Sequence, residues 1–322
     1  MTLIQRRNRA RKRSNMSQIG KSIFSGIPVE YSIPKSTKVV FVNDFFAKDI
    51  EGGAELTSEA IIAKSPVKVF RLHSASLTHR MLEANKDKYW VFGNFTTLPQ
   101  GMIEFIPTSG IRYSLIEYDF KFCAYRSVNR HQQHTGNPCN CPTDVHGLDV
   151  ARLFKNADKV FWMSEGQWNS WLKNVPALES HPGHVILSSV FDDAVLDRLR
   201  SLRTSTTERS PLWAVLGSGS WIKGIEETQK WCSLNRKPFK ALPKLPYGEF
   251  LQELNKYQGF VFMPLDKDTC PRVTIEAKLL GLNLHMNGNV LSKDDSWFKG
   301  TPEECDAYLR TRGSFFWEQL PV

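Results

Sequence analysis

Short apolar runs recur along this chain of 322 residues, and stretches of helical character separate them. The first run, KVVFVND at residues 38–44, is rich in β-branched side chains. Further runs follow at residues 67–72, 89–93, 113–118, 159–163 and 185–190. These runs are continuously apolar rather than alternating, which is typical of strands that helices cover on both faces. Their alternation with helical stretches, such as 54–63 and 148–157, predicts an α/β fold with a mostly parallel sheet.

A second series of the same kind begins after residues 199–210, which are rich in Ser, Thr and Arg and lack apolar periodicity. We interpret these residues as the link between two α/β domains, a number that the chain length also favours. Strands are predicted at 211–218, 239–242, 259–264 and 282–286. Helices are predicted at 224–235, 247–256, 273–281 and 302–320. The predicted parts are a basic arm (1–20), an N-terminal Rossmann-like domain (21–203) and a C-terminal Rossmann-like domain (204–322), whose final helix can pack back on the first domain.

The net charge of +9 is concentrated at the beginning of the chain. Residues 1–15 contain six basic side chains and no acidic one, so subtracting these six leaves +3 for the remainder. A basic arm of this kind can contact nucleic-acid phosphates, anionic lipid or an acidic partner, and it can equally be a solvated tail. The charge alone does not separate these alternatives.

Cellular location is predicted from the absence of apolar signals. No run approaches the roughly 20 apolar residues that span a bilayer, and the beginning of the chain lacks the apolar stretch of a secretory signal. We therefore expect a cytoplasmic protein without a transmembrane segment. Thiols stay reduced in that compartment, so the six cysteines are not expected to form disulfides.

The most informative segment is LDKDTCPRVTIEAKLLG, residues 265–281. A predicted strand ends at Pro264, a polar loop follows, and a helix begins near Val273. Loops at the carboxyl edge of a parallel sheet bind ligands in such folds, and the N–H groups of a helix start suit a phosphate. Asp268 and Glu276 lie eight positions apart and can accept hydrogen bonds from sugar or ribose hydroxyls. Spacing alone also fits an ordinary helix-start Asp and a solvated Glu.

This segment resembles the E-x7-E signature of the large family of retaining GT-B glycosyltransferases that includes sucrose synthases and many bacterial mannosyl- and glucosyltransferases. Asp268 stands at the first Glu of the signature, and Glu276 matches the second, followed by Ala277 and Gly281. The resemblance implies two facing Rossmann-like domains with an interdomain cleft that binds a nucleotide-sugar donor. It further implies that Asp268 lies at the transferred sugar, with a side chain one methylene shorter than usual, and that Glu276 contacts the ribose.

The resemblance continues at VLGSGSWIKGIEE, residues 215–227, which is similar to the strand–loop–KG–helix segment of that family. It implies that Lys223 binds the donor diphosphate, where a cation stabilises the charge that grows on the leaving group. The family often carries an Arg after the glycine that ends this strand, but here Ser218 follows Gly217. Arg272 is our candidate for the missing cation, and we place Gly217, Ser218 and Thr269 in the donor site as well.

Two further segments resemble the N-terminal domain of the family. DIEGGAELT, residues 49–57, follows the first predicted strand and is similar to a GGAE segment whose backbone lines the cleft. Paired glycines let backbone amides approach a ligand closely, so Gly52 and Gly53 are assigned to the donor site. Asp119 follows the strand at 113–118 and aligns with the Asp of the family's HD pair, although Tyr118 replaces the His. We assign a catalytic role to Asp119, Asp268 and Lys223.

The stretch from residue 123 to residue 146 is rich in cysteine and histidine, but its spacing matches no standard zinc finger or ribbon. Our expectation is an acceptor or lid loop, with no cofactor and no metal ligand. Arg126, Arg130 and two histidines can equally form a pocket for an anionic acceptor. A structural zinc site is the alternative, with ligands drawn from Cys123, His131, His134, Cys139, Cys141 and His146.

The predicted activity is transfer of a sugar from a nucleotide-sugar to an acceptor, with retention of configuration and without a metal. The resemblance implies front-face attack in which the leaving phosphate takes the acceptor proton. One alternative is a phage-type glycosyltransferase that modifies DNA bases, which the basic arm favours. Another is a non-catalytic protein that binds a nucleotide-sugar or nucleic acid, which the Asp at position 268 and the missing Arg favour.

Overall fold

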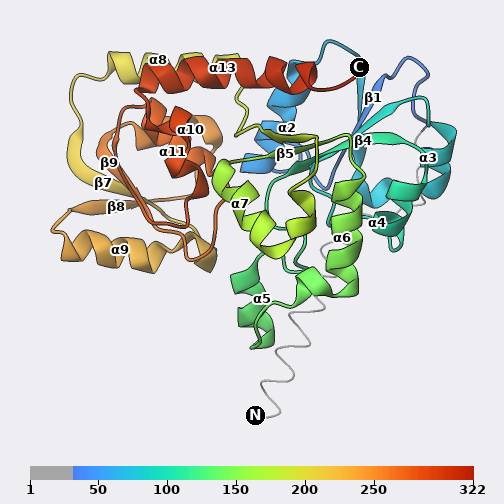
Figure 1. The fold of residues 1–322 in the computed structure, drawn as a ribbon. Coiled ribbons are helices and arrows are strands. Elements are labelled where there is room, and N and C mark those ends of the chain that lie inside the picture. Colours follow the sequence, from blue (N-terminus) through green and yellow to red (C-terminus); the bar gives the residue numbers. More distant parts are fainter. Residues whose placement is uncertain (1–31) are drawn as a thin grey trace. The chain divides into compact units, whose positions relative to one another are not determined.

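A computed structural model describes residues 32–322 of the chain. The predicted basic arm, residues 1–20, lies outside the described residues. Residues Lys35–Val322 form one compact unit, which contains two parallel β-sheets and the helices that pack on them (Figure 1). Among these described helices, none has the length and apolar character needed to traverse a bilayer.

The first sheet has six strands in the order β2-β1-β3-β4-β5-β6, and every neighbouring pair is parallel. Its strands are β1 (Val39–Asn43), β2 (Val69–His73), β3 (Tyr89–Phe92), β4 (Arg112–Glu117), β5 (Lys159–Trp162) and β6 (His184–Ile186). All residues of β1 and β3 are buried, which accounts for their continuously apolar sequences. The six predicted strands are confirmed, but the predicted extension of β6 to residue 190 is wrong. Ser188 has a φ of 71°, and this left-handed conformation ends the strand.

The helices of this first region are α2 (Gly53–Ala63), α3 (His79–Ala84), α4 (Met102–Phe105), α5 (Val128–Thr135), α6 (Val145–Lys155) and α7 (Glu165–Asn174). Helices α5, α6 and α7 each begin at a side chain that accepts a hydrogen bond from the first turn. These caps are Ser127, Asp144 and Ser164, respectively. The sequence does not predict α5, because His131 is the single buried residue of that helix and no apolar stripe exists to reveal it.

The second sheet has four parallel strands in the order β10-β9-β7-β8. They are β7 (Ser210–Leu216), β8 (Phe239–Leu242), β9 (Tyr257–Phe262) and β10 (Asn283–Met286). Helix α9 (Ile225–Leu234) covers one face of the sheet, and α10 (Tyr247–Leu254) and α11 (Arg272–Leu279) cover the other (Figure 1). The strands and helices predicted for this region are all present, with ends that differ by a few residues.

The segment that connects the two sheets is more helical than predicted. Helix α8 (Asp193–Ser205) occupies the first half of the expected link, so the prediction of an irregular segment from residue 199 is wrong. Leu196 and Leu199 lie three positions apart and are both buried, which holds α8 against the core. Residues 206–209 make the actual connection, and the predicted domain boundary at 203/204 falls within α8.

The chain ends in α12 (Ser296–Lys299) and α13 (Pro302–Glu318), and α13 lies beside α8 (Figure 1). Arg310 bridges the two helices through a contact of 2.7 Å between its Nη2 and Oδ1 of Asp197. The C-terminal part of α13 reaches elements of the first region. The indole N–H of Trp317 donates to the carbonyl of Ile61 at 2.7 Å, and Arg312 Nε donates to that of Leu187 at 3.0 Å. The last helix therefore packs against both halves of the compact unit.

Candidate functional site

Two adjoining cavities, of about 310 and about 300 Å³, open among the loops that follow the strands of both sheets. Tyr118, Lys223, Asp268 and Thr269 line both cavities, so we treat them as one cleft with a first and a second cavity. Tyr118 follows β4, Lys223 follows β7, and Asp268 and Thr269 follow β9. The carboxyl ends of parallel strands are the expected position for a ligand site in folds of this kind.

Most of the predicted site residues meet in this cleft. Asp119 joins the shared residues in the first cavity, and Gly53 and Arg272 join them in the second. The predicted residues that line neither cavity are Gly52, Gly217, Ser218 and Glu276. Gly217 packs against β8 instead, where its N–H donates to the carbonyl of Leu242 at 3.0 Å.

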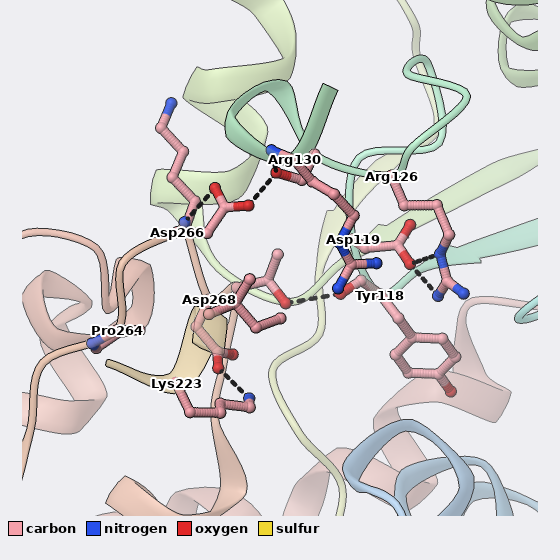
Figure 2. A pocket seen from close by; sticks show the side chains of 12 residues that line it. Tyr118, Asp119, Arg126, Arg130, Lys223, Pro264, Asp266 and Asp268 are labelled. Carbon is pink, nitrogen blue, oxygen red and sulfur yellow. Dashed lines mark hydrogen bonds and ion pairs between the residues drawn. The ribbon is translucent and has the colours of Figure 1, made fainter. Parts of the chain in front are cut away.

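Lys223 and Asp268 form an ion pair in the cleft, with 2.7 Å between Nζ and Oδ2 (Figure 2). Their side chains are 34% and 18% exposed, so both remain accessible to a ligand. The residue after Lys223 is Gly224, which has a φ of 63° and is the N-cap of α9. A Cβ atom at Gly224 would lie 1.9 Å from the carbonyl oxygen of Met263, so only glycine fits there. This close approach positions Lys223 over the end of β9.

The loop that carries Asp268 is fixed by main-chain hydrogen bonds. The N–H of Asp268 donates to the carbonyl of Asn289 at 2.8 Å, and its own carbonyl accepts the N–H of Leu291 at 2.9 Å. Thr269 connects the loop to the first region, because its hydroxyl donates to the carbonyl of Tyr118 at 2.8 Å. The hydroxyl of Ser164 in turn donates to the carbonyl of Thr269 at 2.7 Å. The backbone beside Asp268 is therefore held from both regions.

Arg272 supplies a second cation to the second cavity, although its side chain is buried. Its Nη1 donates to the carbonyl of Val190 at 2.6 Å, and its guanidinium lies 3.7 Å from the ring centroid of Phe191. Within residues 32–322, its Nε–H is buried without a hydrogen-bond partner. The guanidinium of Arg272 therefore has an N–H donor that its present hydrogen bonds do not use.

Two helices begin at the second cavity, and neither has a side-chain cap. Helix α2 begins after Gly52, and α11 begins after Pro271. The first residues of both helices line the cavity, namely Gly53, Ala54, Arg272 and Val273. The free N–H groups and the positive end of each helix dipole favour an anion at this position. The second cavity thus combines two helix starts with two cationic side chains.

Glu276 is buried beneath this cavity rather than on its surface. Its Oε1 accepts the hydroxyl of Tyr247 at 2.7 Å and lies 3.7 Å from Nε of Arg272. Burial raises the pKa of the carboxyl, and Arg272 and Tyr247 oppose that shift. In this structure Glu276 contacts Arg272, which lines the cavity, and Tyr247, which does not, so its predicted contact with a ribose stays a prediction.

Asp119 lines the first cavity, but its carboxylate already has partners. It forms an ion pair with Arg126 (Figure 2), and its Oδ1 lies 3.3 Å from Nζ of Lys121. Burial alone would raise the pKa of Asp119, but Lys121 and Arg126 lower it below its usual value. Burial raises the pKa of the neighbouring Glu117, which also contacts Lys121. Asp119 is thus an ionised, paired carboxylate and does not have the properties of a free general base.

The first cavity has more cationic than anionic side chains. Four cations and three carboxylates line it: Arg126, Arg130, Lys223, Lys267, Asp119, Asp266 and Asp268. Figure 2 shows Arg130 extending from α5 into the space near Asp119 and Asp268. Among the described residues, the guanidinium of Arg130 has no hydrogen-bond or ion-pair partner. The two arginines expected to form a pocket for an anionic acceptor, Arg126 and Arg130, therefore line the same cavity. Arg130 is the one whose guanidinium is available as a hydrogen-bond donor.

Several cleft residues are missing from the sequence-based assignment. Asp266 and Lys267 stand beside Asp268, and Ser127 caps α5 and hydrogen-bonds to Asp266. The hydroxyl of Tyr118 lies 2.7 Å from that of Ser58 in α2. The sequence signal that could have identified these residues is their position directly after predicted strands or beside a recognised motif. Their mutual contacts join segments that are far apart in the sequence.

No protein-family model matches this chain, and no curated protein matches it in sequence. Solved structures do match. The structure of trehalose-6-phosphate synthase OtsA is similar over 88% of this chain and 95% of its own, with a TM-score of 0.52 and 9% identity. The chain has the GT-B fold. A second trehalose-6-phosphate synthase structure, described in connection with enzymatic glycosyltransfer with retention, has a TM-score of 0.50 and 10% identity over 88% of this chain and 92% of its own.

These similarities confirm the predicted architecture, which is an α/β fold with Rossmann-like parallel sheets. At 9–10% identity they establish the fold alone. The assignment of individual residues to chemical roles depends on the geometry of the cleft.

Proposed function

We propose that this chain is a glycosyltransferase that moves a sugar from a nucleotide-sugar donor to an acceptor. The observation that carries the proposal is the meeting of Lys223, Arg272 and two uncapped helix starts in the second cavity. Such an arrangement suits a diphosphate, which carries the anionic oxygens that these donors would bind. The GT-B fold agrees with this reading as an analogy of architecture.

In this proposal the cations act on the leaving group. Negative charge grows on the diphosphate as the bond to the sugar breaks, and preorganised donors stabilise that charge most in the transition state. Lys223 is already oriented by Asp268 at 2.7 Å, so little reorganisation is required. The free oxygen of Asp268 would accept a hydroxyl of the transferred sugar. Glu276 would act through Tyr247 and Arg272 unless the ribose reaches it directly.

We further propose retention of configuration by front-face attack. No histidine lines either cavity in the described part of the chain, so a Ser–His or Cys–His nucleophile is not available there. Burial raises the pKa of Cys270, which lines the second cavity, to about 11, so this thiol is neutral at physiological pH. Asp119 is paired with Arg126 and Lys121. The departing phosphate is therefore the proposed acceptor of the proton, and Asp119 has a positioning role.

The acceptor would enter the first cavity. Its four cations include Arg130, whose guanidinium has no partner among residues 32–322. An acceptor with a carboxylate or phosphate group would fit this surplus of positive charge.

A DNA acceptor is the second candidate, because six of the basic residues of the chain lie within its first fifteen. Deleting residues 1–14 and measuring DNA affinity across a salt series tests that candidate. If the arm binds phosphates, its removal should reduce the dependence of the DNA affinity on salt concentration.

The decisive test is donor turnover by three purified proteins: wild type, Lys223→Ala and Lys230→Ala. Nucleotide-sugars that raise the melting temperature by mass action identify the donor first. Lys223→Ala is expected to lower kcat by about 10²–10³, the loss typical of one transition-state donor. Lys230 is exposed on α9 and lines neither cavity, so its variant should match the wild type. Equal turnover by all three proteins would refute the site, and donor binding without turnover would identify a non-catalytic binding protein.

A further inference from the structure

Four metal-ligating side chains converge outside the cleft lining, in the segment between β4 and α6. Their ligand atoms, Sγ of Cys123, Cys139 and Cys141 and Nδ1 of His131, all lie within 4.8 Å of one another. Cys123 lies just before α5, His131 is the buried residue of α5, and Cys139 and Cys141 follow that helix. His134 and His146 do not belong to the group: His134 stacks on Tyr125, and His146 Nε2 contacts the carbonyl of Lys121 at 3.0 Å.

Three of the six separations within this group are close to the edges of a zinc tetrahedron, and none of the six exceeds 4.8 Å. With Zn–S near 2.3 Å and Zn–N near 2.0–2.1 Å, tetrahedral geometry requires about 3.8 Å between two sulfurs and about 3.6 Å between sulfur and nitrogen. Sγ of Cys123 lies 3.6 Å from Sγ of Cys139. Nδ1 of His131 lies 3.7 Å from Sγ of Cys123 and 3.3 Å from Sγ of Cys141.

Neither a disulfide nor a set of thiol hydrogen bonds accounts for this convergence. A disulfide has its sulfurs about 2.05 Å apart, whereas these cysteines are all free thiols. Thiol hydrogen bonds are weak, and they do not explain four polar groups gathered around one point. Three of the four side chains are buried. Buried polar groups of this kind are normally satisfied by strong partners or by a metal.

We propose that Cys123, His131, Cys139 and Cys141 bind one structural Zn²⁺ ion. Three thiolates and one imidazole form a ligand set that selects zinc among the common metals of the cell. All four positions are filled by the protein, so the ion has no open site for a substrate and does not take part in sugar transfer. This replaces our expectation from the sequence that the segment binds no metal.

The local structure explains why this segment needs an ion. Helix α5 has eight residues and buries His131 alone, so it has almost no apolar surface with which to pack. Cys141 is held close to α6, because a Cβ atom at Gly147 would lie 1.8 Å from the carbonyl oxygen of Cys141. A zinc ion that joins α5 to this anchored residue would supply the cohesion that apolar burial does not.

The proposed ion also bears on the first cavity. Arg126 lies in the chain between the ligands Cys123 and His131, and Arg130 immediately precedes His131. Both arginines line the cavity, and the segment that bears them has no strand in the described structure. The zinc site would therefore hold the two guanidinium groups in position from outside the cleft.

Metal content of the full-length protein is the primary test, because it does not depend on any activity. Protein expressed with ample zinc and iron is expected to contain one zinc per chain and no stoichiometric iron. After exchange with Co²⁺, it should show the visible d–d bands and the thiolate charge-transfer bands of a tetrahedral cobalt site. Folded wild-type protein that contains no zinc and gives no such bands overturns the proposal, as does stoichiometric iron.

Matched variants assign the ligands. Cys139→Ser and His131→Ala are expected to lose most of the bound zinc, whereas Cys232→Ser and His134→Ala should keep it. Cys232 is a buried free thiol on α9, and His134 lies one turn from His131 without belonging to the group. Zinc retained by both ligand variants would contradict the assignment. If those variants do not fold, the zinc content and the cobalt spectrum of the wild-type protein still test the proposal. A zinc-containing protein without sugar transfer would refute the proposed function alone.

Discussion

The two walls of the cleft are built by different means. The second-sheet wall consists of Lys223 and residues 264–273, and main-chain hydrogen bonds and the tight turn at Gly224 hold it. The first-sheet wall of the first cavity consists of residues 118–130, and the ion pairs of Lys121 and Arg126 and the cysteine–histidine group hold it. On the second-sheet wall, Lys223 and Asp268 pair with each other but are 34% and 18% exposed, so both can reach a ligand. Several charges on the first-sheet wall stabilise the wall itself, so removing them should affect folding before chemistry.

The largest expected effect is at Lys121, which is 3% exposed and lies 3.3 Å from both Glu117 and Asp119. Lys121→Met removes the shared cation from the buried Glu117 and from the partly exposed Asp119, which keeps its pair with Arg126. The free energy of unfolding should fall by about 3–5 kcal/mol, whereas Lys223→Ala should change it by no more than about 1 kcal/mol. Urea denaturation of both variants measures the difference. A loss below about 1 kcal/mol in Lys121→Met would remove the distinction between the two walls.

A pH series at Asp295 tests a contact between the two regions outside the cleft lining. The carboxylate of Asp295 accepts the N–H of Glu165 and the indole N–H of Trp297, both at 3.3 Å. Burial raises its pKa from 3.8 to about 6. Between these values the folded state keeps a proton that the unfolded chain has lost, so the free energy of unfolding should decrease as the pH rises. The expected decrease is on the order of 2–3 kcal/mol.

Asp295→Asn provides the matched control for this series, because its amide does not titrate. The difference in unfolding free energy between wild type and variant should change through the window from about pH 4 to about pH 6 and then stay constant. Parallel pH profiles for the two proteins would show that Asp295 is not the group responsible.

A moderate effect is expected at the turn that positions Lys223. Gly224→Ala introduces a side chain at a φ of 63°, against the carbonyl of Met263. The loss of unfolding free energy should be about 1–3 kcal/mol. Gly219→Ala is the control, because its Cβ meets nothing within 4 Å, and it should stay within about 0.5 kcal/mol of wild type. Thermal denaturation compares the two, and equal stability would mean that the turn tolerates a side chain.

The smallest expected effect on stability is at Arg130, the one member of the first-sheet wall that we expect to act on a ligand. Arg130→Ala should change the free energy of unfolding by less than about 0.5 kcal/mol. Once an anionic acceptor is known, the same variant should raise its KM by about 10- to 100-fold, which corresponds to one lost charge-assisted hydrogen bond. Arg130→Lys should recover only part of the loss, since it keeps the charge without the planar fork. An unchanged KM would place the acceptor elsewhere.

The sequence predicted the second-sheet wall more completely than the first. Asp268, Lys223 and Arg272 were all assigned from one loop and one turn, and all three line the cleft. Their positions follow from local rules, since each comes directly after a strand or begins a helix. On the first-sheet wall, Asp119 lines the cleft, but its pairing with Lys121 and Arg126 was not predicted. Helix α5 was also missed, because it has no apolar stripe.

By itself, the sequence determined the order of strands and helices and the loops that carry the cleft residues. Continuous apolar runs and helix boundaries are local properties, and local spacing is enough to reveal them. Only the tertiary structure decided that Glu276 is buried against Tyr247, that the carboxylate of Asp119 is already paired, and that Cys123 lies 3.6 Å from Cys139. The physical reason is that burial, ion pairing and metal-ligand geometry depend on distances between side chains in space, and the chain path fixes those distances only when both sheets and their loops have packed.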